Sequence, residues 1–195
     1  MDKKLIYILN HYSNKSEEHF YHVINLLTIM ADKGIKIALV IEKCDDIPAV
    51  IHHNIEVVCQ KEKNHIKRVI ELFRILYGLI KKGYKKIFIR ISINSAIISI
   101  ICAKIFGAMT YYWQSGTTYE VDVNKPIIEK IKWLLFSYSR FWIVKSFVNH
   151  FVTGPESMID YYINKLKIKR DKMILLYNDV DIKRFSVPSL EEKKK

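Results

Sequence analysis

The fold of this chain is indicated most clearly by the stretch Asp171-Lys172-Met173-Ile174-Leu175-Leu176-Tyr177-Asn178-Asp179-Val180-Asp181-Ile182-Lys183-Arg184-Phe185. Residues 173–176 are an apolar run, which is typical of a buried strand. An Asn/Asp turn follows the run, and a short amphipathic segment then ends at Phe185. The stretch therefore predicts a last strand, followed by a turn and a connecting segment.

Strands and helices alternate along the rest of the chain. Short apolar runs predict strands at residues 5–10, 37–41, 55–58, 86–91, 109–113, 151–153 and 173–176. Apolar residues at helical spacing predict helices that begin near residues 16, 64, 94, 126 and 155. Such alternation implies right-handed βαβ units. We therefore expect an α/β fold, a single doubly wound, Rossmann-like parallel sheet of about six or seven strands with helices on both faces.

Composition limits the classes of partner. The 195 residues suffice for one domain, and the formal charge of +12 predicts attraction to nucleic acid, anionic lipid or phosphorylated substrates without choosing among them. No RNA-binding signature accompanies the charge, so we expect no specific nucleic-acid partner. Cys44, Cys59 and Cys102 form no CxxC pair and lie in apolar segments. They predict buried free thiols in a reducing compartment.

Several kinds of segment and site are not expected. The first residues lead straight into a strand too short for a signal peptide, and the longest uncharged run, residues 91–103, is too short to span a bilayer. We therefore predict a cytoplasmic protein. Neither a GxGxxG motif nor a P-loop occurs, so no tightly bound cofactor is expected. His52 and His53 have no partners at ligand spacing, which predicts no metal site.

Candidate site residues follow from the strand ends, because ligands of open parallel sheets bind at the carboxyl ends of the strands. The loop after the first strand could hold an anion, a donor phosphate or an acceptor group, although a capped, solvated turn explains it equally well. Later strand ends supply amide, hydroxyl and carboxylate groups. The cleft residues predicted from these loops are Asn14, Lys15, Ser16, Gln114, Ser115, Gly116, Glu156 and Asn178.

The segment from residue 125 to residue 145 combines aromatic and basic side chains. Such a helix can lie at a membrane interface. A core helix with a solvated basic edge explains the pattern as well, and the two alternatives stay open at this point. The membrane-facing residues under the first alternative are Lys130, Lys132, Trp133, Arg140 and Trp142.

Three motifs resemble the family 4 glycosyltransferases of the GT-B type. Residues 151–185 are similar to the pattern Val-Thr-x-Ser-x-x-Met, then Asp-Lys-Ile, then Asn-Gly-Val-Asp-x-x-x-Phe. Residues 18–27 resemble Glu-x-His-Val-x-x-Leu, and residues 33–37 resemble Arg-Gly-His-x-Val. Asp179 stands where that pattern has glycine, and residues 14–16 stand where the family has a Gly-Gly pair.

The resemblance implies a role for each part of the chain. Residues 1–185 would be the N-terminal, acceptor-side domain of a retaining hexosyltransferase, and residues 186–195 a linker or disordered charged tail. A nucleotide-sugar donor would be held mainly by a C-terminal domain, in cis or as a separate subunit. The acceptor would be a glycan or a lipid-linked sugar, reached from the cytoplasmic membrane face.

One residue departs from the family at the reacting centre. Gln114 stands where many members have a histidine, which makes it the candidate catalytic residue. Glutamine cannot act as a base, but its amide can orient an acceptor hydroxyl or the sugar ring. Because the donor domain is not in this sequence, the chain alone is expected to be inactive. The alternative is a stand-alone Rossmann-like binding module, or a non-catalytic subunit of a split transferase.

Overall fold

The computed structural model describes residues 3–14, 17–49, 52–114, 116 and 126–177. Its strands form one seven-stranded sheet in the order β3-β2-β1-β4-β5-β6-β7, and all the pairings are parallel. The strands are β1 (Lys4–Tyr12), β2 (Lys36–Cys44), β3 (Ile55–Cys59), β4 (Lys86–Arg90), β5 (Met109–Trp113), β6 (His150–Thr153) and β7 (Met173–Leu175). The predicted α/β, doubly wound, Rossmann-like sheet is confirmed.

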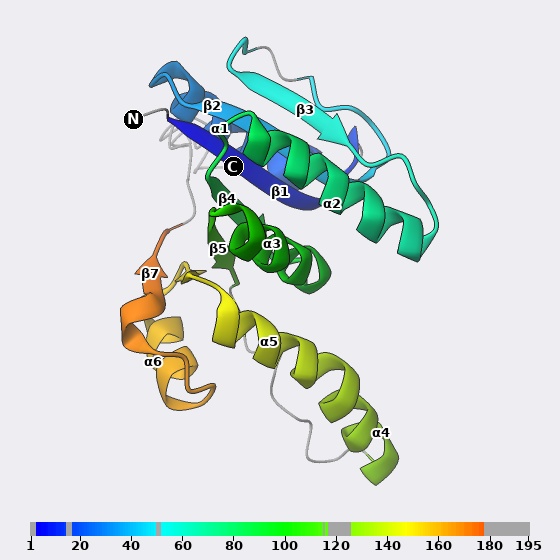
Figure 1. Ribbon diagram of the computed structural model, residues 1–195. Coiled ribbons are helices and arrows are strands. Elements are labelled where there is room, and N and C mark those ends of the chain that lie inside the picture. Colours follow the sequence, from blue (N-terminus) through cyan, green and yellow to red (C-terminus); the bar gives the residue numbers. More distant parts are fainter. Residues whose placement is uncertain (1–2, 15–16, 50–51, 115, 117–125, 178–195) are drawn as a thin grey trace, which may run out of the picture.

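Helices connect successive strands, apart from β2 and β3 (Figure 1). They are α1 (Glu17–Asp32), α2 (His65–Lys81), α3 (Ile93–Phe106), α4 (Ile127–Lys132), the π-helical η2 (Trp133–Tyr138), α5 (Ser139–Phe147), α6 (Glu156–Asn164) and the 3-10 turn η3 (Arg170–Lys172). Asn64 accepts backbone hydrogen bonds at the start of α2, and Gly107 ends α3 in the left-handed conformation. The helix predicted from Pro126 continues to Phe147 with a π-helical middle.

Each face of the sheet has its own core, and β1 contributes to both. Ile6 and Ile8 pack with α2 and α3 on one face, whereas Tyr7 and Leu9 pack with α1 on the other. Successive side chains of a strand point to opposite faces, so a strand that is buried on both sides must be apolar throughout. This explains why the first strand has no alternating polar pattern.

The cysteine prediction is wrong for two of the three residues. Cys44 and Cys59 form a disulfide, with their Cα atoms 5.7 Å apart, because the carboxyl ends of β2 and β3 place them side by side. Cys102 is free and buried, as predicted, and burial raises the pKa of its thiol to about 11. The cysteines therefore give no support for a reducing compartment.

Candidate functional site

The carboxyl edge of the sheet has the geometry of a ligand site. β1 lies between β2 and β4, and the chain leaves β1 toward one face and β4 toward the other. The connections diverge at this point, which leaves a crevice beside the strand ends. Polar side chains gather there on both faces of the sheet.

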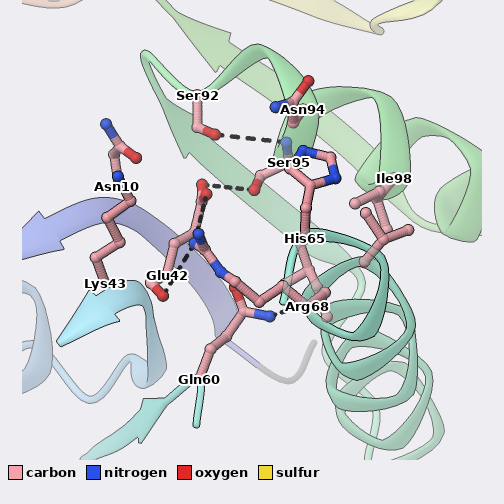
Figure 2. Close-up of a pocket in the computed structure, with 12 residues that line it drawn as sticks. Asn10, Glu42, Lys43, Gln60, His65, Arg68, Ser92, Asn94, Ser95 and Ile98 are labelled. Carbon is pink, nitrogen blue, oxygen red and sulfur yellow. Dashed lines mark hydrogen bonds and ion pairs between the residues drawn. The ribbon is translucent and has the colours of Figure 1, made fainter. Parts of the chain in front are cut away.

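A cavity of about 230 Å³ lies on the face that carries α2 and α3. Its walls come from the carboxyl ends of β1 and β2, the residue after β3, and the first turns of α2 and α3. The lining residues, most of which are polar, are Asn10, Glu42, Lys43, Gln60, His65, Arg68, Val69, Leu72, Ser92, Asn94, Ser95 and Ile98. Figure 2 shows Glu42, Arg68 and Ser95 directed toward one another at the centre of this group.

A buried carboxylate forms the base of this cavity. Glu42 is 9% exposed, its Oε1 accepts a 2.5 Å hydrogen bond from the Ser95 hydroxyl, and its Oε2 lies 3.6 Å from Nη2 of Arg68. Nη2 of Arg68 also donates to the Glu42 carbonyl at 3.1 Å, and Gln60 donates to the Arg68 carbonyl at 2.8 Å. A buried charge needs such a partner. The network therefore holds a carboxylate and a guanidinium in fixed positions.

An arginine occupies the carboxyl end of β4 on the opposite face. Nη2 of Arg90 lies 2.8 Å from Nε2 of His22, and its guanidinium carbon lies 4.4 Å from the centroid of the Trp113 ring. Tyr7 packs in the same hollow, and burial raises the pKa of its hydroxyl although the nearby Arg90 opposes the shift. Stacking and hydrogen bonding hold the Arg90 cation in place. His22 is thus part of a structural pair.

Ile91 lies between these two polar clusters in a strained conformation. Its φ is +67°, which is rare for a β-branched residue. Its carbonyl accepts a 2.9 Å hydrogen bond from the Tyr112 hydroxyl. Arg90, before the turn, contacts His22 of α1, and the turn places Ser92 at the start of α3, where the Ser92 hydroxyl caps the helix. Strain of this kind persists where the surrounding structure enforces it, and it is common at functional sites.

Replacing Ile91 by glycine tests this strain. The side chain is 48% exposed, so little packing is lost, and glycine adopts a positive φ without the steric cost of roughly 1–2 kcal/mol. We expect Ile91→Gly to leave the free energy of unfolding unchanged or to raise it by up to about 1 kcal/mol. Ile101→Gly, at a 47% exposed position inside α3, should lower it by about 1 kcal/mol. Urea denaturation measures both, and equal destabilisation would contradict the assignment of strain.

Gln114 lies directly after β5 but beneath the surface. It is 5% exposed, and its Oε1 accepts a 3.0 Å hydrogen bond from Tyr112. The Tyr162 hydroxyl donates to the carbonyls of Gln114 and Gly116, at 3.2 and 3.0 Å, which fixes the chain where it leaves the strand. Gly116 has a φ of +117°, a conformation that favours glycine. The structure thus places Gln114 at the predicted strand end, as a buried side chain.

The other predicted cleft residues are spread along the edge. Asn14 is exposed, and its backbone N–H donates to Asp46 at 2.9 Å. Glu156 opens α6, where its carboxylate accepts a 2.7 Å hydrogen bond from Tyr177. Neither belongs to the cavity at Glu42. The remaining four, Lys15, Ser16, Ser115 and Asn178, lie outside the described residues.

The helix formed by α4, η2 and α5 is largely exposed at its beginning. Only Phe141 and Val144 are buried in α5, which packs on α3, and no residue of η2 is buried. Large apolar side chains are exposed through α4 and η2: Ile127, Ile128, Ile131, Leu134, Leu135 and Phe136 are between 51% and 73% exposed. We call these six residues the apolar projection. In Figure 1 this part of the helix extends away from the sheet.

The predicted membrane-facing residues have different environments. Lys132, Arg140 and Trp142 are exposed, Trp133 is half-buried, and the side chain of Lys130 lies outside what the structure describes. Nη1 of Arg140 lies 3.3 Å from Oδ1 of Asn94, which lines the cavity. The apolar projection therefore ends one helical turn before a residue that contacts the lining of the cavity. Among the described residues, no helix is long and apolar enough to cross a bilayer, and no group of three or more ligating side chains could hold a metal ion.

Three charged residues were missed by sequence reasoning: Glu42, Arg68 and Arg90. Glu42 and Arg90 each end an apolar strand run, a signal that could have marked them. Arg68 has no such signal, because it lies on a helix among other basic residues. Its place beside Glu42 depends on how α2 packs over the sheet.

Comparison with known proteins shows the fold. No known protein family and no curated protein matches the sequence. Among solved structures, HepE of Anabaena in complex with UDP and glucose is 13% identical with a TM-score of 0.59, over 96% of this chain and 47% of its own. A glycosyltransferase of Rickettsia africae is 14% identical with a TM-score of 0.56, over 98% and 48%. The UDP-GlcNAc 2-epimerase of Neisseria meningitidis is 8% identical with a TM-score of 0.60, over 97% and 52%.

This chain has the fold of a GT-B half-domain. It spans about half the length of the solved proteins that it matches. Those proteins include both glycosyltransferases and sugar-nucleotide epimerases, and at these identities the likeness shows the fold alone.

Proposed function

We propose that this chain is the N-terminal, acceptor-side half of a retaining GT-B glycosyltransferase of the hexosyltransferase type. The observation that carries the proposal is the cavity at the carboxyl edge of the sheet. It lies in a domain whose fold matches about half the length of HepE and of the Rickettsia glycosyltransferase. The family 4 motifs in residues 18–37 and 151–185 support the same assignment. A nucleotide-sugar would bind mainly to a donor-binding domain, supplied in cis or as a separate subunit, that closes over this edge.

The role of this half in the proposed reaction is to position the acceptor. Retaining glycosyl transfer depends on holding the acceptor hydroxyl against the donor carbon and on stabilising the leaving diphosphate. Fixed polar groups at the strand ends suit the first task, and the Arg90 cation suits interaction with an anion at the opposite side of the crevice. Asn14, Lys15, Ser16, Ser115, Gly116, Glu156 and Asn178 are proposed to complete this wall of the cleft in the assembled enzyme.

Gln114 is proposed to orient the reacting groups from its buried position after β5. In the two-domain enzyme, we expect Gln114→Ala to lower turnover by about 100-fold, because a misplaced reacting group costs that much. The free energy of unfolding should fall by only about 1–2 kcal/mol, from the lost hydrogen bond to Tyr112. Steady-state kinetics and urea denaturation give the two numbers.

The matched control for Gln114 is Thr110→Val. Thr110 is 1% exposed on the same strand, and its hydroxyl bonds to Asn149 at 3.0 Å, away from the carboxyl edge. This variant should lose similar stability and keep its turnover. If Gln114→Ala also keeps wild-type turnover, Gln114 is purely structural.

A membrane surface is the proposed place of action. The apolar projection and the neighbouring basic residues Lys130, Lys132 and Arg140 have the composition of an interfacial helix. With the formal charge of +12, they favour reversible binding to an anionic bilayer at the cytoplasmic face. A lipid-linked acceptor would then reach the carboxyl edge directly.

Two alternatives differ from this proposal in assays. The chain could be a stand-alone binding module or a non-catalytic subunit of a split transferase. Mass spectrometry of the native protein from its source would distinguish a longer two-domain polypeptide from a separate subunit.

The likeness to sugar-nucleotide epimerases favours a second candidate, the half-domain of an epimerase. An epimerase converts its sugar-nucleotide without an acceptor, whereas a transferase requires one.

A further inference from the structure

We propose that the cavity between α2 and α3 binds one neutral sugar residue, whose hydroxyl groups bond to the carboxylate of Glu42 and the guanidinium of Arg68. The inference rests on the proposed function only for the role of that sugar as the acceptor. The binding itself follows from the cavity.

The cavity is a built polar site. Glu42, Gln60 and Ser95 line it and are 9%, 9% and 1% exposed. Glu42 follows the run of buried residues from Ile37 to Ile41 in β2, so an apolar residue would continue the core at its position. Instead the chain places a carboxylate there and supports it with Ser95 and Arg68. Three supporting elements, β2, α2 and α3, thus hold one charged pair rigid.

The charged pair retains hydrogen-bonding capacity toward the cavity. A carboxylate can accept about four hydrogen bonds. Within the described residues, the side chain of Glu42 accepts one, from Ser95, while Arg68 lies at an ion-pair distance of 3.6 Å. The Arg68 side chain is 20% exposed, and its buried Nε is without a hydrogen-bond partner in the part of the chain that is described. An acceptor and a donor at adjacent positions complement neighbouring hydroxyl groups, each of which can donate and accept.

The rim of the cavity adds neutral polar groups. Figure 2 shows Asn10, Ser92 and Asn94 around the charged pair, from the ends of β1 and β4 and the start of α3. Amides and hydroxyls both donate and accept, which suits a ring with several hydroxyl groups. Val69, Leu72 and Ile98 supply an apolar wall for the carbon face of such a ring.

Size and charge are compatible with one neutral ring. The volume of about 230 Å³ accommodates a single sugar ring, and a neighbouring cavity of about 280 Å³ shares Glu42, Lys43, Gln60 and Arg68 with it. Lys43 and Arg68 offset the charge of Glu42, so the sign of the lining charge does not select the ligand by itself. A neutral hydroxylated ring can bond to both members of the charged pair without displacing either, and the titration with UDP and phosphate separates it from an anion.

Amide NMR of the labelled chain tests this proposal. Methyl glycosides of hexoses, N-acetylhexosamines and deoxyhexoses would be titrated one at a time. At least one should shift the signals of Asn10, Gln60 and Asn94 saturably, with a Kd of roughly 1–10 mM, as expected for a ligand of about a dozen heavy atoms. UDP and inorganic phosphate should leave these signals unchanged.

Variants separate a role in binding from a role in folding. Glu42→Gln keeps the size of the side chain and should weaken sugar binding by at least about tenfold. The control is Glu56→Gln, an exposed carboxylate on β3, which should bind as the parent chain does. The NMR titration of the parent chain tests binding in the cavity even if Glu42→Gln fails to fold. Absence of saturable shifts with every glycoside, or stronger shifts with UDP or phosphate at the same signals, would overturn the proposal.

Failure of the sugar-binding proposal can be distinguished from failure of the proposed transferase function. Sugar binding in the cavity, combined with no transfer by the two-domain protein, would refute the transferase and leave this site standing. Transfer without sugar binding in the cavity would refute this site alone.

Discussion

The chain alone is expected to transfer sugar at least about 10⁴-fold more slowly than the same half joined to a donor-binding domain. Alignment of two reactants in one site corresponds to an effective concentration of roughly 10⁵–10⁸ M, and half of a cleft cannot supply it. The polar groups at the carboxyl edge, such as Glu42 and Gln114, can position an acceptor but do not enclose a donor. Under the proposed function, most of the rate enhancement should therefore be lost without a donor-binding domain.

Radiolabelled transfer from a nucleotide-sugar to lipid or glycan acceptors measures this loss. The two-domain protein, or a mixture of the chain with its donor-binding subunit, is the positive control. Circular dichroism of the isolated chain would establish that low transfer does not reflect unfolding. Robust turnover by the folded chain alone would show that the donor site lies within these 195 residues.

Membrane binding is the second prediction with a large effect. Vesicles that contain anionic lipid should bind the chain, and Lys130→Glu with Lys132→Glu should weaken the binding by about 100-fold. Each basic residue near an anionic surface contributes on the order of 1 kcal/mol, and a reversed charge adds repulsion. Binding should also weaken at high salt, because salt screens exposed charges.

The apolar contribution is tested separately at the apolar projection. Leu135 and Phe136 are 61% and 65% exposed, so Leu135→Ser with Phe136→Ser removes two side chains that could enter the interface. This pair should reduce vesicle binding without lowering stability much. Ile66→Ser, at a 70% exposed position on α2, is the matched control.

The charge reversal also has a matched control. Lys33→Glu with Lys36→Glu changes the net charge equally at exposed positions next to the start of β2. If this pair weakens binding as much as the pair in α4, the attraction comes from net charge alone. Equal binding to anionic and zwitterionic vesicles, or none to either, would leave the basic face as ordinary solvated surface.

Much of the fold could be predicted from the sequence because its signals are local. Apolar runs such as residues 37–41 mark buried parallel strands, and helix ends carry their own caps at Asn64 and Gly107. The alternation of strands and helices then restricts the sheet to a doubly wound arrangement. These features need no knowledge of which residues meet in space.

The site could be predicted less well because its contacts are not local. Glu42, Arg68 and Ser95 come from three elements, and their meeting depends on how α2 and α3 pack over β2. The disulfide between Cys44 and Cys59 likewise depends on the register of two neighbouring strands. Strand-end reasoning placed Gln114 directly after β5, as the structure has it, although periodicity could not reveal that its side chain is buried.

The helix after Pro126 shows a further limit. An apolar, aromatic sequence describes a core helix and an interfacial helix equally well. In the structure, α5 buries Phe141 and Val144 against the sheet layer, while the apolar projection stays exposed. That division along one helix has no counterpart in its sequence pattern.

The most direct test of the proposed function is the product formed by the two-domain protein from a nucleotide-sugar, analysed by NMR with and without an acceptor. A retaining glycosyltransferase should link the sugar to the acceptor with the anomeric configuration that it had in the donor, and should form this product only when the acceptor is present. A free sugar-nucleotide with one inverted stereocentre, formed without an acceptor, would contradict the account and favour an epimerase.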